Sequence, residues 1–140
     1  MIVSRPRLDP QRSSRLYYKL LKLAPELHLI REHAVSKAAG FMDLNLDILE
    51  RTDGYLRIAL SHYWRHPSGD LIADPDMEVA VLLKNKVAEA LTYQDAFTYE
   101  VAYPRDGELP DLGVHTRLNV FLEYWLGALA EQGHGFSRSE

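Results

Sequence analysis

The sequence predicts a single α+β domain, in which a five-stranded antiparallel sheet with meander topology is flanked by an N-terminal and a C-terminal helix. Between Phe41 and Tyr103, apolar residues mostly fall at every second position. A β-strand turns successive side chains to opposite faces, so this spacing predicts strands with one buried face. Before and after this block, apolar residues recur three and four positions apart, as they do in amphipathic helices. Most connections between the expected strands are short, which favours antiparallel neighbours.

Length and composition are those of one globular domain. The chain has 140 residues, of which 46% are hydrophobic and 26% are charged, and domains of about 100–150 residues are the commonest size. Because the chain has no cysteine, disulfides, thiolate nucleophiles and cysteine-based zinc sites are excluded. The N-terminus lacks the apolar run of a signal peptide, and no apolar stretch approaches the ~20 residues that span a bilayer. We therefore expect a cytoplasmic protein without a membrane span, and the sequence indicates no cofactor.

The first helix has a clear start and a clear end. Asp9 followed by Pro10 is typical of an N-cap and the first helical position. Helical spacing continues to Ala24, and Pro25 ends the helix because its ring clashes with a further turn. Because the first helix begins at residue 9 and the last is expected to end at Gly133, we expect a flexible arm (1–8), a single α+β domain (9–133) and a disordered tail (134–140).

The remaining elements are placed by periodicity and by turn residues. Asp53-Gly54 predicts a tight hairpin, because both residues tolerate positive φ. The acidic, proline-containing stretch 66–76 is expected to be a loop. A second short helix is expected at 26–35, and the last helix at 115–132, with Gly133 at its end. Strands are expected near 41–51, 55–65, 77–84, 87–93 and 97–103.

The motif Asn119-Val-Phe-Leu-Glu-Tyr-Trp-Leu126 in the last helix resembles the C-terminal motif of domain-of-unknown-function family 1249, which comprises small uncharacterised proteins of proteobacteria. The resemblance implies a small, soluble bacterial protein and no established activity. Further stretches resemble the same family in the same order: Tyr17-Tyr-Lys-Leu-Leu-Lys-Leu-Ala-Pro25, Ile48-Leu-Glu-Arg-Thr52 with Tyr55, Val87-Ala-Glu89, and Tyr103-Pro104.

Two stretches of the chain depart from the family pattern. Where the family tends to have a Tyr-His-Asp-like run, this chain has Leu82, Leu83 and Lys84. Where the family has an acidic residue and a lysine before the last helix, this chain has Asp111-Leu-Gly-Val-His115. The sequence leaves open whether the departures at Leu83, Lys84 and His115 abolish a family site.

The polar residues of the family-like motifs form the candidate binding site, and none is assigned a catalytic role. Two carboxylates and an arginine would support acid–base or anion-binding chemistry if the fold brought them together. Glu50 and Glu89 alternate in step with the apolar residues of their expected strands, which places both side chains toward the covered face of the sheet. The alternative is a structural polar network that ties a helix to the sheet, since a buried carboxylate needs a partner. The candidate residues are Glu50, Arg51, Glu89, Tyr103 and Asn119.

The basic residues of the first helix form a second candidate site. Residues 1–37 hold eight basic and three acidic residues, a net charge of +5, whereas the remainder carries −9. A stripe of this kind would attract an anionic partner, or it would neutralise the acidic body of the protein. The acidic body argues against a nucleic-acid partner, because such binding depends on phosphate neutralisation. The stripe consists of Arg12, Arg15, Lys19 and Lys22.

No metal site is predicted. His62 and His66 are four residues apart on an expected strand, which separates them by ~13 Å, too far for one ion. The acidic residues Asp70, Asp74 and Asp76 do not have the spacing of a calcium-binding loop.

Signatures of nucleotide-binding loops and nucleophile elbows are absent from the sequence. We therefore predict a binding or interaction protein without catalysis, whose partner is another protein or a second copy of the chain. The first alternative is an enzyme or small-ligand binder with an acid–base or anion site between the sheet and the C-terminal helix. The second is binding of an anionic partner by the basic helix. Self-association would use the apolar residues expected on the second face of the sheet, Ala80, Leu82, Ala88 and Ala90.

Overall fold

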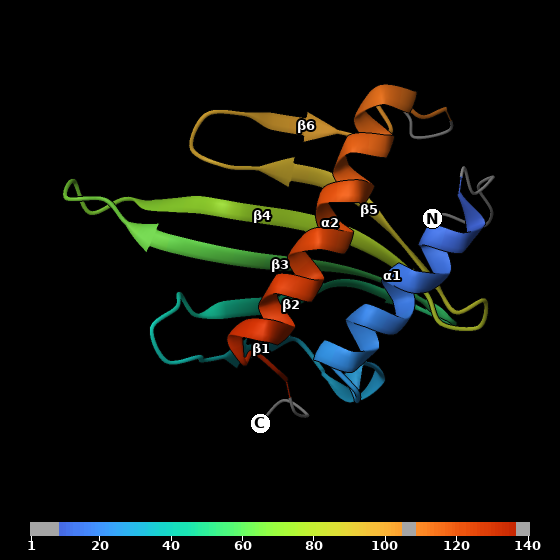
Figure 1. Ribbon diagram of the computed structural model, residues 1–140, viewed down its shortest axis with the longest axis horizontal. Coiled ribbons are helices and arrows are strands. Elements are labelled where there is room, and N and C mark those ends of the chain that lie inside the picture. The colour runs from blue at the N-terminus through green and yellow to red at the C-terminus, as the bar shows by residue number, and fades with distance from the viewer. Residues whose placement is uncertain (1–8, 105–108, 137–140) are drawn as a thin grey trace.

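The computed structural model describes residues 9–104 and 109–136. Two long helices and one sheet make up the domain (Figure 1). The elements, in chain order, are α1 (Pro10–Leu23), the short 3-10 helix η1 (Leu27–Leu29), β1 (His33–Ser36), β2 (Leu44–Thr52), β3 (Tyr55–Arg65), β4 (Leu71–Leu82), β5 (Val87–Gln94), β6 (Tyr99–Val101) and α2 (Leu112–Gln132).

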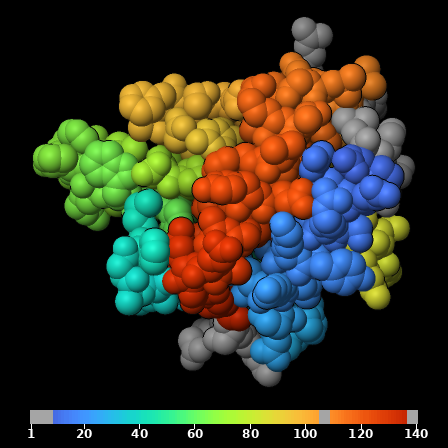
Figure 2. Space-filling model, in the orientation of Figure 1, coloured from blue at the N-terminus to red at the C-terminus, as the bar shows by residue number. Residues whose placement is uncertain are grey.

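The sheet has six strands whose spatial order is the order of the chain, and each strand pairs with its neighbours antiparallel. Helices α1 and α2 lie next to each other across one face of this sheet (Figure 1). In the space-filling view the two helices form a joint surface, beyond which the β3–β4 turn and the β5–β6 hairpin project (Figure 2). The predicted α+β class and the meander topology are confirmed, and the predicted count of five strands is wrong.

The additional strand is β1, which lies where a second short helix was predicted at 26–35. The chain forms only a single 3-10 turn at η1 and then extends, so that His33 lies opposite Asp47 and Ser36 opposite Leu44. A four-residue strand is too short to show a periodicity of its own. Its conformation comes from pairing with β2, which local sequence does not reveal.

The predicted loop at 66–76 is also corrected, because β4 begins at Leu71. Ser61 pairs with Asp76 and Tyr63 with Ala73, so two residues of β4 face one residue of β3. The extra residue belongs to a β-bulge at Asp74-Pro75, where the missing N–H of proline is tolerated. Asp74-Pro75-Asp76 interrupts the alternation of apolar residues, so the periodicity of the sequence does not predict the first part of β4.

Alternation along the central strands builds the core. Val79 lies opposite Ile58 and is buried with it under the helices, which confirms the predicted inward face of β4. Other strand residues on this face include Leu56, Leu60, Met77 and Val81, and the helices contribute Leu16, Leu20, Leu23, Leu118, Leu122, Leu126 and Leu129.

Both long helices begin at an aspartate cap, which was predicted for Asp9. Asp9 accepts a hydrogen bond from the Arg12 backbone N–H at 3.0 Å, and Asp111 accepts one from the Val114 N–H at 3.1 Å. Helix α2 therefore starts at residue 112, three residues earlier than predicted. It ends at Gly133, whose φ of 98° is a left-handed conformation that glycine adopts without strain.

The domain extends beyond its predicted end at residue 133. His134 and Phe136, which fall within the predicted tail (134–140), are both buried. The rest of that tail (137–140) and the predicted arm (1–8) lie outside the described residues. Among the helices that the structure describes, none is long and apolar enough to cross a membrane.

Candidate functional site

The predicted binding residues separate into two groups. Glu89, Tyr103 and Asn119 come together near the outer edge of β5, whereas Glu50 and Arg51 make contacts elsewhere. Glu50 accepts a hydrogen bond from Arg57 at 3.4 Å. Arg51 donates hydrogen bonds to the backbone carbonyls of η1 and the residue after it. The predicted single site therefore loses its arginine and one of its carboxylates.

A β-bulge explains the position of Glu50. The register between β2 and β3 shifts between Ile48 and Glu50, so Glu50 lies opposite Arg57 on the face that the helices do not cover. Arg57 also donates to Glu78 at 2.9 Å. The alternation argument that placed Glu50 and Glu89 on the covered face is wrong for both residues. One extra residue inverts the alternation before Glu50, and Glu89 pairs with Ala80 on the opposite face.

Glu89 is the centre of a buried polar cluster. Only 8% of the residue is exposed, and its Oε2 atom accepts hydrogen bonds from the Tyr103 hydroxyl and from Nε2 of His115, the latter at 2.6 Å. The Tyr103 and His115 rings are perpendicular, with centroids 5.7 Å apart. An ionised carboxylate only accepts hydrogen bonds, so the proton of His115 is assigned to Nε2.

Sequence reasoning missed His115, which was noted only as a departure from the family pattern. The signal that could have found it is its spacing from Asn119. Residues four apart on a helix lie on the same face, and Asn119 was already a candidate.

Asn119 joins α2 to the edge of the sheet. Its Oδ1 accepts from the Ala90 backbone N–H at 2.8 Å, and its Nδ2 donates to the His115 carbonyl at 2.9 Å. Strand β6 pairs with β5 only as far as Thr92, and the Ala102 N–H then bonds the Leu91 carbonyl. Asn119 thus supplies the acceptor that a longer β6 would have supplied to Ala90.

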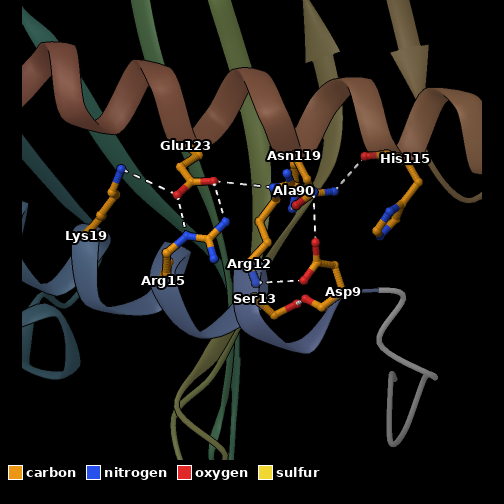
Figure 3. A network of polar contacts seen from close by, with 9 residues as sticks. All are labelled: Asp9, Arg12, Ser13, Arg15, Lys19, Ala90, His115, Asn119 and Glu123. Carbon is orange, nitrogen blue, oxygen red and sulfur yellow. Dashed lines mark hydrogen bonds and ion pairs between the residues drawn. The ribbon is translucent and has the colours of Figure 1, made fainter.

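A cavity of about 270 Å³ lies between the first turns of α1 and α2, next to this cluster. Figure 3 shows these two helix starts side by side, with the side chains of α2 directed toward α1. His115 and Asn119 are buried, whereas Thr116 is exposed at the rim. All six lining residues are polar: Asp9, Arg12, Ser13, His115, Thr116 and Asn119.

The basic stripe of α1 faces a carboxylate on α2. Glu123 forms ion pairs with Arg15 at 2.6 Å, Arg12 at 3.3 Å and Lys19 at 3.6 Å (Figure 3). Lys22 lies farther along the helix, beside a second hollow of about 320 Å³. Three of the four stripe residues are therefore paired with a single carboxylate of α2.

This arrangement makes the stability of the protein depend on acid pH. Hydrogen bonding from Arg15 and the positive charges around it lower the pKa of Glu123 from 4.5 to about 2. Because the folded-state pKa is lowered, the stabilisation is complete above pH 4.5 and is lost as the pH falls toward about 2. We expect Glu123→Gln to flatten this part of the pH–stability curve measured by urea unfolding. Glu131→Gln, at an exposed carboxylate on the same helix, should leave the curve unchanged; equal effects would contradict the assignment.

The remaining sequence candidates do not converge. His62 is buried and its Nδ1 bonds the Asp43 carbonyl at 2.8 Å, while His66 bonds Ser68 in the β3–β4 turn. Among the described residues, no three histidine, aspartate or glutamate side chains are grouped so that they could hold a metal ion.

The expected apolar second face of the sheet is also corrected. Ala88 pairs with Val81 and Ala90 with Val79, so both alanines lie on the face covered by the helices. Ala80 lies on the opposite face but is only 1% exposed. Of the four residues predicted for self-association, only the half-buried Leu82 is left with partial exposure on that face.

Comparison with family models matches residues 15–135 to a domain of unknown function, DUF6908. The resemblance to family 1249 and the proteobacterial origin that it implied are not confirmed by this match. Comparisons with curated proteins and with solved structures found no match. Since the match includes every element from within α1 to the end of α2, the chain belongs to the DUF6908 family.

Proposed function

We propose that the protein binds a small polar molecule in the cavity between the first turns of α1 and α2, with His115 as the ligand-contacting group. The observation that carries this proposal is that His115 is 7% exposed and held by a buried carboxylate, yet lines the cavity. Holding a histidine in one orientation at the wall of a polar cavity is the arrangement expected of a recognition group.

The hydrogen bonding of His115 indicates what the ligand must offer. With the Nε2 proton directed at Glu89, a neutral ring has its lone pair on Nδ1. Within the described parts of the chain, Nδ1 has no hydrogen-bond partner. A ligand with a hydroxyl or amine donor would satisfy this nitrogen, while Arg12 and Thr116 provide donors for an acceptor group.

The volume and the charged residues of the cavity restrict the class of ligand further. A volume of about 270 Å³ lies just below the usual range of drug-sized sites, about 300–1,000 Å³. Arg12 at the cavity pairs with Asp9 at 3.1 Å and with Glu123 at 3.3 Å, but a guanidinium has five N–H donors, so donors remain for the carboxylate of a ligand. The site therefore favours a compact molecule that carries a donor next to an acceptor, of which a small hydroxy acid is the simplest example.

The Glu89–His115 pair also has the geometry of a general base, because a carboxylate holds the imidazole in one orientation. An activated nucleophile is not found beside it in the described residues. One hydroxyl among the lining residues is that of Ser13, which already donates to the Asp9 carbonyl at 3.0 Å. For this reason we propose binding as the function and acid–base catalysis only as its alternative.

The test is a titration of the ¹⁵N-labelled protein with glycolate, acetate and glycerol, observed at the histidine ring nitrogens by NMR. Glycolate carries both a hydroxyl and a carboxylate, whereas acetate and glycerol each lack one of these groups. We expect the His115 signals to shift most with glycolate, in the millimolar range where ligands this small bind.

Thr116→Trp should abolish these shifts, because the indole would fill the cavity from its exposed rim. The matched control is Val120→Trp, one turn further along the same face of α2 and also exposed, which should leave them intact. The proposal is overturned if His115 does not respond to any of the three probes, or if both tryptophan variants respond alike.

A further inference from the structure

Residues 133–136, which follow α2 and which we call the C-terminal strap, are fastened to two distant elements. The Gly135 N–H donates to the Ser36 hydroxyl oxygen at 2.9 Å, and Nδ1 of His134 lies 2.8 Å from the same oxygen. The Phe136 N–H donates to the Leu23 carbonyl at 2.8 Å. The strap therefore joins β1 to the end of α1.

The strap brings a second histidine against the buried His62 of β3. Both histidines are 6% exposed, and their ring centroids are 5.9 Å apart. The Trp125 ring of α2 packs edge-on against His62 at 5.6 Å. Nε2 of His134 is buried and makes no hydrogen bond of good geometry among the described residues, although the Met42 backbone lies close enough to interact with the ring. Two neutral imidazoles fit at this separation, whereas two protonated rings would repel each other in a buried site.

The groups around His134 favour its neutral form on balance. Burial, and then the nearby His62, lower the pKa of His134 below 6.5, while the Met42 backbone and the Asp43 carboxylate act in the opposite direction. Asp43 is itself paired with Lys37 at 2.6 Å. The contacts from α1 and α2 come from the Leu23 carbonyl and from Trp125, neither of which carries a charge.

We propose that the C-terminal strap is a pH-operated latch, closed over β1 and the end of α1 when His134 is neutral and released when its ring is protonated. Release would uncover Ser36 and Leu23, which are 3% and 1% exposed in the closed form. This inference does not depend on ligand binding at the α1–α2 cavity, because the strap residues do not line it.

The direction of the pH dependence follows from linkage. A histidine whose pKa is lower in the closed state than in the open state stabilises closure at high pH. That stabilisation decreases as the pH falls below 6.5, the ordinary value, and continues to decrease until the closed-state pKa is reached. One proton accounts for at most about a tenfold change in the opening equilibrium per pH unit.

Hydrogen exchange by NMR tests the latch in the intact chain. We expect the protection factors of the Gly135 and Phe136 amides to fall by up to about tenfold per pH unit below 6.5. The Leu60 amide in the centre of the sheet should keep its protection over the same range. A loss of protection at Leu60 in step with the strap would mean global unfolding and would overturn the proposal.

Two substitutions identify the responsible group. His134→Asn keeps a polar atom near Ser36 but does not titrate, so strap protection should become independent of pH. His66→Asn, at an exposed histidine in the β3–β4 turn, should leave the wild-type pH dependence in place. Persistence of that dependence in His134→Asn would overturn the proposal.

A direct measurement keeps the proposal testable if the His134→Asn strap fails to close at any pH. The ring signals of His134 in the wild-type protein should titrate with a midpoint below 6.5. In His62→Asn this midpoint should move upward, because the electrostatic effect by which His62 lowers the pKa of His134 is removed. A wild-type midpoint at or above the ordinary value would show that closure does not select the neutral ring.

Discussion

Glu89→Ala is expected to lower the free energy of unfolding by about 3–5 kcal/mol, because it leaves two buried hydrogen-bond donors without their acceptor, at about 1–3 kcal/mol each, and a small cavity beside them. Glu89 is the shared acceptor of the Tyr103 hydroxyl and of His115 Nε2. Without it, two polar groups would stay buried without their acceptor. Each such group costs its own desolvation energy, and the truncated side chain leaves a cavity beside them.

Urea unfolding of wild type and variant measures this difference. The control is Glu100→Ala, which removes the partner of Arg117 in an exposed ion pair and should cost no more than about 1 kcal/mol. Glu89→Gln keeps the shape and an acceptor oxygen, so its cost should lie between the two. If Glu89→Ala is no more destabilising than Glu100→Ala, the buried cluster does not contribute as described.

Asn119→Ala is expected to destabilise the protein by about 2 kcal/mol or more, chiefly through the Ala90 backbone N–H. This N–H is buried and bonds Asn119 Oδ1 at 2.8 Å, and no residue of β6 is placed to replace the lost acceptor. The His115 carbonyl loses less, because it remains within the hydrogen-bonded backbone of α2.

A local readout separates this effect from a general loss of packing. In Asn119→Ala, hydrogen exchange at the Ala90 amide should accelerate more than at other amides of β5. Thr116→Ala, at an exposed position of the same helix, should change stability by no more than about 0.5 kcal/mol. Unchanged exchange at Ala90 would show that Asn119 does not complete the edge of the sheet.

Local patterns were sufficient for much of the fold. The alternation through Met77, Val79 and Val81 predicted both the strand and its buried face, because each of these residues packs under the helices. Asp9 and Gly133 marked the two ends of the helical cover, since capping depends on residues adjacent in sequence. Features with a local physical cause were therefore accessible from the sequence.

Features caused by strand pairing were not accessible. Strand β1 and the first part of β4 are extended because of their partners. The bulge before Glu50 inverted its face, and a second register shift between Glu78 and Val79 leaves Leu91 as the extra residue of β5. The composition of a strand does not reveal an extra residue, and beyond that residue the alternation predicts the wrong face for every side chain.

The candidate site was predicted in part for the same reasons. Glu89, Tyr103 and Asn119 were selected because they belong to motifs that resemble a family, and the structure brings these three together. Their partner His115 was overlooked because it interrupts that resemblance. The cavity itself depends on how α1 and α2 pack, which a single sequence does not specify.

The position of the cavity also affects when it can form. Every strand pairs with its neighbour in the chain, so the sheet can assemble from successive hairpins with short loops, which form early. The two walls of the cavity come from Asp9–Ser13 and from His115–Asn119, at opposite ends of the domain. During synthesis the cavity cannot form until α2 has been made and has packed against α1. A ligand held there would stabilise only a chain whose folding is complete, so its occupancy would distinguish finished molecules from truncated ones.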